Sequence, residues 1–487
     1  MIAFLLSVCV RIPQLARPMS HHHESISAYE LITIESWKQA GGPARFNDIP
    51  LSSYQQPGDK RIPNNYNIDK NGNEIYISYG TGWNLLPYYS FELLHIAPTP
   101  LALRLLNICI GLVACFRLFW LMVLVSGDDS KKYGSAAIAC IAFLFTPGTL
   151  WYFSNVYVNC GVAIPFIIAF LYCLLQMILH PQAIRASNLI LLFLLVICLL
   201  CIDWIGCFLA FTSTLVLLFK IKKNRRLAYP MMVIILGTIA GLGLIAWQFI
   251  SYLGPSMVQG NLAYRFSNRT VHASQGFLHP FTATAVHFAT ASLPVIALLV
   301  IALLAGRRRK ENLPPGNNAL VLYVILLPAL LLYNTSFLSW TSIHEFSILY
   351  YTILFAIGTG TLLPRVWPIK KTAIALMALI TVTVVEYYLV NPPGSKTWNG
   401  EAHNVYRQLG DSIAKKAAPG QAVFMNLELL PPVEFYAKRN IMYAASPEEA
   451  KQLLSNFKTS EGIWIQQNGF HITRVAYIHK EGPTGKQ

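Results

Sequence analysis

Charged side chains are scarce in this sequence. Asp, Glu, Lys and Arg make up 12% of its 487 residues, while 54% of the residues are hydrophobic. A soluble protein of this length could not cover its surface with so few charges. The composition therefore excludes an ordinary soluble protein and indicates a chain that has the lipid bilayer as its solvent.

Acidic residues are the rarer of the two signs, with 22 Asp and Glu against 37 Lys and Arg and a net charge of +15. In a soluble protein this excess would indicate a nucleic-acid partner. Here most of it falls in short loops between apolar runs, which is the positive-inside pattern of membrane proteins. No nucleic-acid partner is expected.

Cysteine patterns of the usual functional kinds are absent. All nine cysteines lie in or beside apolar segments. The CxxC spacing of Cys198 and Cys201 falls inside an apolar run, and neither it nor any Cys/His spacing indicates a zinc site. Nothing in this pattern indicates a disulfide framework, and the cysteines are predicted to be core residues. The sequence also has no solenoid repeat and no low-complexity tract.

Eleven apolar runs are present instead, each roughly the ~20 residues that a bilayer requires or slightly shorter. They predict membrane-spanning helices at 1–15, 101–126, 135–154, 155–179, 188–204, 205–220, 230–253, 285–306, 319–336, 346–364 and 372–391. The first run, "MIAFLLSVCVRIP", is short and lacks a basic flank. A signal-peptide core is the alternative, but no small-residue cleavage site follows it.

The loops between the runs give the spans an orientation. Alternate loops are basic or neutral to basic and read "SGDDSKKYG", "HPQAIRAS", "KIKKNRR", "RRRKENLPP" and "RVWPIKK". The opposite side receives residues 16–100, 254–284 and 339–347, together with the C-terminal region. Because Lys and Arg gather in cytoplasmic loops, the N-terminus is predicted inside and the C-terminal region outside.

Two regions outside the spans are predicted to be folded. In residues 67–80 an Asn-Gly turn separates two alternating runs, which favours a hairpin, and residues 81–96 favour an aromatic helix at the membrane interface. Residues 392–487 alternate helical and strand-like segments, which predicts a small outer α/β domain. The expected division is a transmembrane domain of residues 1–391, including the outer loop 16–100, and a domain of residues 392–487.

Ionisable groups at the ends of spans are candidate functional residues. Four clusters qualify on the predicted outer side: "HHHE" at 21–24, Asp203, the pair Arg265 and Arg269, and His344 with Glu345. Since all four are expected to face one compartment, they are predicted to converge on one cavity.

Glu24 and Glu30 receive different interpretations. "SAYE" at 27–30 fits a capping box in which Ser27 caps a helix and Glu30 reaches back, so Glu30 is assigned a structural role. Glu24 precedes that expected helix, beside His23, and a carboxylate at the membrane boundary gains basicity as it loses hydration. Glu24 is thus a candidate general base. A loop at headgroup level and a metal site with the histidines are the alternatives.

The remaining candidates also have alternatives. Arg265 and Arg269 are four residues apart, so a helix would place them on one face, where they can clamp a phosphate or contact lipid headgroups. His344 and Glu345 suit either a functional site or an interfacial cap. Asp203 suits either a functional site or a turn at the surface.

Several stretches together resemble the GT-C superfamily of membrane glycosyltransferases, which contains protein O-mannosyltransferases and bacterial aminoarabinose transferases. "HHHESISAYELITIESW" is similar to the histidine–acid stretch after the first span of bacterial members. "YISYGTGWNLLPYYSFELL" and "PLALRLLN" are similar to the aromatic run before their second span. "NVYRQLGDSIAKKAAPGQAVFMN" and "PVEFYAKRN" are similar to the start of their outer C-terminal domain.

The resemblance implies an α-helical, multi-pass GT-C fold in the inner (cytoplasmic) membrane. It implies transfer of a sugar from a polyprenyl-phosphate-linked donor to a glycan, lipid or protein acceptor, with inversion. Glu24 matches the general base that takes the acceptor proton. Arg265 and Arg269 would stabilise the departing phosphate, with His344 as a helper.

The expected substrate-binding set is completed by His23, Asp203 and Glu345. The sequence departs from the family in one respect: several families carry a second acidic residue in the loop after the third span, where this sequence has Asn155 and Asn159. No cofactor is expected, and the departure argues against a mechanism that depends on a divalent metal.

Two other classes of function fit part of the pattern. A transporter or flippase of a lipid-linked or anionic substrate would use the same basic residues without a base. It would also have broken helices and repeated halves, neither of which the sequence indicates. A scaffold or receptor fits the outer domain but leaves "HHHE" unexplained, so a membrane glycosyltransferase is predicted.

Overall fold

The computed structural model describes residues 1–19, 23–63, 67–127, 130–269, 278–308, 317–390, 400–426, 431–468 and 471–480. The chain forms two compact units. The first, here called the helical unit, comprises Met1–Leu15, Arg104–Ala246 and Arg265–Asn391. The second, the mixed unit, comprises Ala16–Leu103, Trp247–Tyr264 and Pro392–Gln487.

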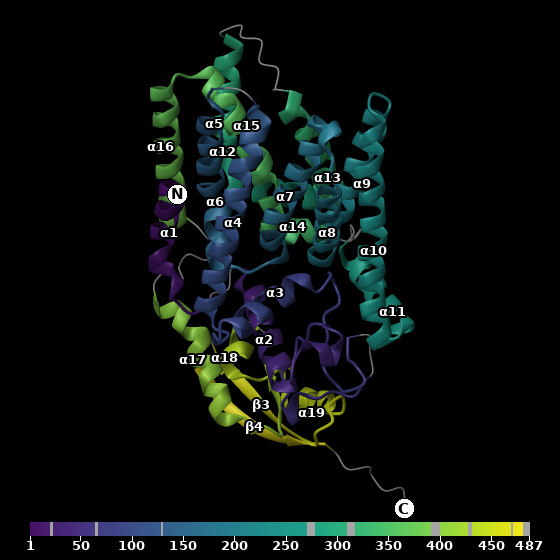
Figure 1. Cartoon of the computed structure of the whole chain (residues 1–487). Coiled ribbons are helices and arrows are strands. Elements are labelled where there is room, and N and C mark those ends of the chain that lie inside the picture. The colour runs from purple at the N-terminus through teal and green to yellow at the C-terminus, as the bar shows by residue number, and fades with distance from the viewer. Residues whose placement is uncertain are drawn as a thin grey trace, which may run out of the picture. The chain divides into compact units, whose positions relative to one another are not determined.

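The helical unit is a bundle of long apolar helices (Figure 1). Neighbours along the chain pack side by side, as α7 does with α8, and distant segments also pair, as α5 does with α15. Its helices, some extending into the mixed unit, are α1 (Ile2–Leu15), α4 (Pro100–Ser126), α5 (Lys132–Leu144), α6 (Pro147–Asn155), α7 (Asn159–Leu179), α8 (Ala186–Ile202), α9 (Ile205–Ile221), α10 (Ala228–Leu253), α11 (Pro255–Arg269), α12 (Leu278–Arg308), α13 (Asn317–Ser336), α14 (Leu338–Ile343), α15 (Tyr351–Val366) and α16 (Ile369–Val385). Short helical turns between them are η3 (Pro181–Ala183), η4 (Arg225–Leu227), η6 (Glu345–Tyr350) and the π-helix η7 (Glu386–Val390).

Each predicted span coincides with a helix or a helix pair. Among the described residues, six helices are long and apolar enough to cross a membrane, and a seventh span results if the bent pair α5 and α6 is counted as one. Helices α1, α8 and α9 are apolar but shorter. The helical membrane fold is thus confirmed, while the number of eleven spans stays a prediction.

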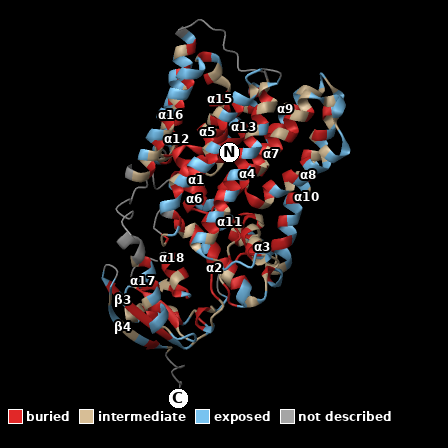
Figure 2. Cartoon of the chain, turned by 60° about the vertical axis from the view of Figure 1, so that its left-hand side comes forward, coloured by how far each residue is buried: buried red, intermediate tan, exposed pale blue. Residues whose placement is uncertain are grey.

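The outer faces of these helices carry large apolar side chains. Figure 2 shows the buried residues between the helices and exposed residues along their outward faces. Ile239 and Phe219 are 65% and 69% exposed, although water is an unfavourable solvent for them. Lipid is the medium that suits this surface.

A sharp bend separates α5 from α6, which meet at 65°. Pro147 begins α6, and α1 supplies the charge that satisfies the carbonyls there: the Arg11 guanidinium donates to the backbone oxygens of Leu150 at 3.1 Å and Thr149 at 3.3 Å. All nine residues of α6 are buried. The bend is therefore a packed feature. It corrects the sequence-based expectation that no helix is broken.

The mixed unit contains a four-stranded sheet with order β2–β1–β3–β4 (Figure 1). Strands β1 and β2 are parallel, β1 and β3 are parallel, and β3 and β4 are antiparallel. Its elements are α2 (Glu24–Ala40), η1 (Pro43–Phe46), η2 (Pro57–Asp59), α3 (Gly82–Leu93), α17 (Gly400–Lys416), β1 (Ala422–Met425), α18 (Pro431–Ala437), β2 (Ile441–Tyr443), α19 (Pro447–Leu454), β3 (Glu461–Asn468) and β4 (His471–His479).

Alternation along the strands builds a core on each face of the sheet. Val423 and Ile463 face one core with Leu409 of α17, while Phe424 and Trp464 face the other with α19. Period-two alternation sends successive side chains to opposite faces. The small α/β fold predicted for the C-terminal region is confirmed.

The loop before the second span packs with this α/β fold. The Tyr54 backbone N–H donates to Asn440 Oδ1 at 2.9 Å, and the Arg439 guanidinium pairs with the Asp59 carboxylate at 3.3 Å. The loop therefore belongs to the same compact unit as residues 392–487. The sequence-based division placed it with the transmembrane domain, because these polar contacts join segments almost 400 residues apart and no local pattern indicates them.

The turn predicted within residues 67–80 is present. Asp69 accepts backbone hydrogen bonds from Asn71 and Asn73, and Ile68 bridges Glu74 as an antiparallel pair. Gly72 has φ +86° and a Cβ there would lie 2.4 Å from the Arg61 carbonyl oxygen, so glycine is required. A single bridge forms here in place of the longer hairpin that was expected.

Candidate functional site

Asp203 is the buried centre of the candidate site in the helical unit. It has an extended backbone between α8 and α9, and its side chain is 0% exposed. Oδ1 accepts from the Ile205 backbone N–H at 2.9 Å, and Oδ2 accepts from the Asn159 side-chain amide and from the Tyr333 hydroxyl at 3.4 Å. The alternative of a surface turn is wrong, because three elements enclose this carboxylate.

Around Tyr333 lies an aromatic cluster, defined here as Tyr333, Phe337, Trp340, Phe346 and Tyr350. Tyr333 contacts Phe337, Trp340 and Tyr350 edge-on, with ring centroids 5.3, 6.1 and 5.8 Å apart. Trp340 and Phe346 are 5.5 Å apart. The cluster joins the end of α13 to α14 and η6, and it connects Asp203 with the basic residues described next.

Arg269 lies against this aromatic cluster. It ends α11, is 8% exposed, and its guanidinium carbon lies 5.9 Å from the Trp340 ring centre and 6.0 Å from that of Phe337. Such cation–π contacts hold a guanidinium with little loss of its capacity to donate hydrogen bonds. Arg265 is half-buried on the same helix, four residues earlier, so the expected helical spacing of the pair is present.

His344 and Glu345 complete the site. The His344 ring stacks on Phe346 at 4.9 Å and meets Trp340 edge-on at 5.1 Å. Burial lowers the pKa of His344 to about 4, with further contributions from Arg269 and His287, so its imidazole is neutral at pH 7. Glu345 is 5% exposed and accepts from the Thr290 hydroxyl at 3.2 Å.

The structure therefore brings four predicted residues into one set of contacts: Asp203, Arg269, His344 and Glu345. They come from three places in the chain, since His344 and Glu345 are adjacent in one link. Tyr333 and Trp340 contact Asp203, Arg269 and His344. The arrangement offers a positive charge beside aromatic surface, flanked by two buried carboxylates. Chemically, this suits an anionic group carried on an apolar or sugar-containing molecule.

Glu24 lies in the mixed unit. It is the first residue of α2, is 0% exposed, and pairs with the Arg17 guanidinium at 2.7 Å. The expectation that it precedes the helix is wrong, because the helix begins four residues earlier than a Ser27 cap would require. His23 precedes it with a left-handed backbone, φ 55°. Residues 20–22, which include the first two histidines of "HHHE", lie outside the described residues.

Glu30 is inside α2, so it forms no capping box with Ser27. It is 1% exposed and its Oε2 accepts from the Asn84 amide of α3 at 2.5 Å. Burial raises the pKa of Glu30 to about 8, and the Asn84 hydrogen bond lowers it less. Glu30 is therefore a buried, largely protonated acid at neutral pH, and its role is in the packing of α2 against α3.

Sequence reasoning missed the connecting residues Asn159, Tyr333 and Trp340. Asn159 was noted only as a departure from an acidic pattern, although its amide holds the Asp203 carboxylate. Asn155 instead donates to the Trp151 carbonyl and the Ser154 hydroxyl. The sequence signal available was the crowding of aromatic residues at 333–351, at the predicted outer end of two spans.

Metal binding has little support among the described residues. In that part of the chain, no three His, Cys, Asp or Glu side chains lie close enough together to hold an ion. The absence of a cofactor stays a prediction.

Comparison with known proteins bears on the fold. No protein-family model and no curated protein matches the sequence. Among solved structures, ArnT of Cupriavidus metallidurans bound to undecaprenyl phosphate is similar with a TM-score of 0.57 and 14% identity, over 95% of this chain and 92% of that one.

Two structures from Archaeoglobus fulgidus are also similar. The oligosaccharyltransferase AglB in complex with an inhibitory peptide and a dolichol-phosphate has a TM-score of 0.53 and 12% identity, over 95% of this chain and 68% of that one. The apo oligosaccharyltransferase has a TM-score of 0.52 and 10% identity, over 95% and 69% of the two chains. At such identities the likeness shows the fold alone: this chain shares the fold of these structures, as the resemblance implied.

Proposed function

We propose that this protein is a membrane glycosyltransferase that moves a sugar from a polyprenyl-phosphate-linked donor to an acceptor at the outer face of the membrane. The observation that carries the proposal is Arg269 held against the aromatic cluster beside Asp203 and His344, within a GT-C fold. The similar ArnT and AglB structures hold undecaprenyl phosphate and dolichol-phosphate, which supports this class of carrier.

In this proposal Arg269 and Arg265 bind the donor phosphate. As the bond between the sugar C1 and the phosphate oxygen breaks, negative charge grows on the departing polyprenyl phosphate. Fixed guanidinium groups in a site of low polarity stabilise that charge. His344, neutral at pH 7, can donate one hydrogen bond without adding a further cation.

Glu24 is proposed as the general base. It would take the proton of the acceptor hydroxyl while the acceptor oxygen attacks C1 from the face opposite the phosphate, which inverts the configuration. Its ion pair with Arg17 holds the carboxylate in one place, and a base must be positioned as well as ionised. His23, adjacent to Glu24, is proposed to contact the acceptor. The acceptor is a glycan, lipid or protein.

Asp203 and Glu345 are proposed as substrate-binding residues. Asp203 holds Tyr333 through a hydrogen bond, and Tyr333 supports Trp340 against Arg269. Glu345 is adjacent to His344 and is held by Thr290. Both would act by positioning groups that touch the donor.

A transporter or flippase of a lipid-linked substrate is the second candidate, because α5 and α6 form one bent pair. Broken helices in transporters usually line a water-filled cavity. Here the residues of α6 are all buried and Arg11 satisfies its carbonyls. The bend therefore favours a transporter only weakly, and glycosyl transfer remains the proposal.

The proposal is tested by incubating the purified full chain with undecaprenyl-phosphate-linked sugars and measuring free undecaprenyl phosphate. A transferase releases the carrier when a suitable acceptor is present, and Arg269→Ala releases far less. A transporter reconstituted in vesicles would instead move the intact donor between leaflets. Intact donor throughout, in every acceptor mixture including a membrane extract, would contradict the proposal.

A further inference from the structure

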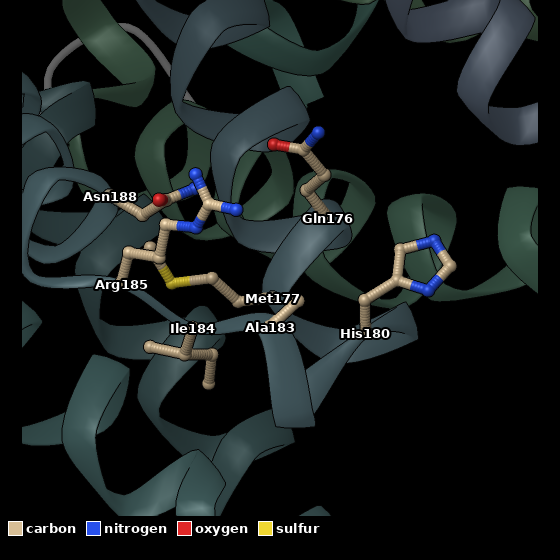
Figure 3. A pocket seen from close by; sticks show the side chains of 7 residues that line it. All are labelled: Gln176, Met177, His180, Ala183, Ile184, Arg185 and Asn188. Carbon is tan, nitrogen blue, oxygen red and sulfur yellow. The ribbon is translucent and has the colours of Figure 1, made fainter.

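A pocket lies in the helical unit, at the link between α7 and α8 (Figure 3). Its cavity volume is about 270 Å³. Seen as in Figure 3, Arg185 and Asn188 lie on one side and Gln176 and His180 on the other. The lining is completed by Met177, Ala183 and Ile184.

This pocket is separate from the candidate site. Asn159 begins α7 and Asp203 follows α8, whereas the pocket is formed where α7 ends and α8 begins. The 21 residues of α7 place the two ends about 30 Å apart, at 1.5 Å per residue. A ligand of the pocket would therefore not contact Arg269 or Asp203.

The polar lining is suited to an anion. Arg185 immediately precedes α8, so its guanidinium lies at a helix N-terminus, where backbone N–H groups favour negative charge. Within the part of the chain that the structure describes, no hydrogen bond or ion pair engages the Arg185 side chain. Gln176, Asn188 and His180 add side-chain donors.

The surroundings are strongly basic. The Arg226 guanidinium donates to the Gln182 carbonyl at 3.3 Å, which brings the next basic loop beside the pocket. That loop contributes Lys220, Lys222, Lys223, Arg225 and Arg226. Between residues 130 and 310 the sequence has one acidic residue, Asp203, and it lies at the other end of α8. These loops therefore contain no carboxylate that would compete with a bound anion for their basic side chains.

We propose that this pocket binds a phosphate-bearing anion, either the headgroup of an acidic phospholipid or a soluble phosphate, with Arg185 as the principal contact. A guanidinium donates two parallel hydrogen bonds to one phosphate. Helices α7 and α8 are apolar on both sides of the link, so a lipid with its headgroup in the pocket keeps its chains beside apolar surface.

The first arm of the test uses phospholipid. Native mass spectrometry of the full chain in detergent measures the affinity for phosphatidylglycerol and phosphatidylcholine. Arg185→Gln is expected to weaken phosphatidylglycerol binding on the order of tenfold. Lys223→Gln removes one charge from the neighbouring loop without touching the pocket and should weaken it about twofold or less. Equal losses in the two variants would overturn the proposal.

The second arm uses inorganic phosphate alone, with calorimetric titration of wild type and Arg185→Gln. If wild type binds inorganic phosphate and Arg185→Gln does not, a soluble anion is sufficient as the ligand. If only phosphatidylglycerol binds in a manner that depends on Arg185, the ligand is the lipid headgroup. Arg185 is exposed, so the variant should unfold at the wild-type temperature. If neither ligand binds in a manner that depends on Arg185, the pocket is not an anion site.

Discussion

The side-chain amide of Asn159 donates a hydrogen bond to the Asp203 carboxylate, which joins the first turn of α7 to the link between α8 and α9. The same carboxylate accepts from the Ile205 backbone and the Tyr333 hydroxyl. A buried charge is stable only when its oxygens are paired in this way. Asp203 thus fixes the position of the aromatic cluster that holds Arg269.

Asp203→Asn should lower both stability and turnover. The substitution sets two side-chain amides against each other and weakens charge-assisted hydrogen bonds, at a cost of about 1–3 kcal/mol in the free energy of unfolding. Thermal unfolding of the purified variant measures that cost. Asp411→Asn is the control, because Asp411 is about half exposed and only weakly paired with Arg407. Equal unfolding temperatures for both variants would contradict a structural role for Asp203.

Arg269→Ala should weaken donor binding or turnover by roughly tenfold or more, because it removes a charge-assisted contact to phosphate. Arg269→Lys should restore activity only in part, since the forked geometry and the stacking on Trp340 are lost. Steady-state kinetics with an undecaprenyl-phosphate sugar measure both effects. Arg307→Ala, at an exposed position near the end of α12, is the matched control. Wild-type kinetics in Arg269→Ala would refute this assignment.

Much of the helical architecture could be predicted from the sequence, because membrane spans are specified locally. Apolar runs and basic loops located the helices that coincide with the predicted spans, and alternation with Pro-Gly breaks predicted the α/β character of the C-terminal region. Helices α11 and α14 were missed, because they lie in segments that were taken as outer loops. The bend between α5 and α6 was missed. Pro147 begins α6, and the Arg11 guanidinium satisfies the Leu150 carbonyl from 139 residues away, a contact that no local pattern reveals.

Of the residues in the candidate site, only the ionisable ones could be predicted from the sequence. Arg269, Asp203 and His344 were found because ionisable groups are conspicuous at span ends. The contacts that join them run through Tyr333 and Trp340, and aromatic residues in a membrane protein are ordinary. For Glu24 and Glu30 a local pattern was misleading. The capping pattern predicted a helix that begins after Ser27, whereas α2 begins at Glu24 and Glu30 accepts a hydrogen bond from Asn84 of α3.

Glu24→Gln tests the proposed base. A base contributes ~10²–10⁴-fold in rate, so turnover should fall by that factor. The variant also leaves the Arg17 guanidinium without its charged partner, so a loss of stability is expected with it. Turnover alone therefore cannot separate a catalytic role from a structural one.

Arg17→Gln provides the separation. It breaks the same ion pair but keeps the carboxylate, so a catalytic Glu24 predicts that Arg17→Gln retains far more turnover than Glu24→Gln at comparable stability. Rates and unfolding temperatures are measured for both variants under the same conditions. Parallel losses of rate and stability in the two would show that the pair has only a structural role.

Glu30 should make the protein less stable as pH rises. Its pKa in the folded state is about 8, above the ordinary value of 4.5, so the folded chain keeps a proton that the unfolded chain has lost. The contribution is fully present below pH 4.5 and declines by about 1.4 kcal/mol per pH unit until about pH 8.

Glu30→Gln removes this titration while keeping a polar group beside Asn84. Its unfolding temperature should therefore exceed that of wild type at pH 8 to 9 and approach it near pH 5. Unfolding curves across this range, taken as the difference between the two proteins, cancel other buried acids such as Glu434, whose pKa is also raised by burial. A difference that does not change with pH would contradict the buried, protonated state.

The central claim is that a polyprenyl phosphate is recognised at Arg269 and the aromatic cluster. Cryo-electron microscopy of the full chain with undecaprenyl phosphate tests this most directly. The phosphate is predicted within hydrogen-bonding distance of the Arg269 guanidinium, with Trp340 and His344 beside it. A phosphate bound elsewhere, with the Arg269 guanidinium unliganded, would contradict the account.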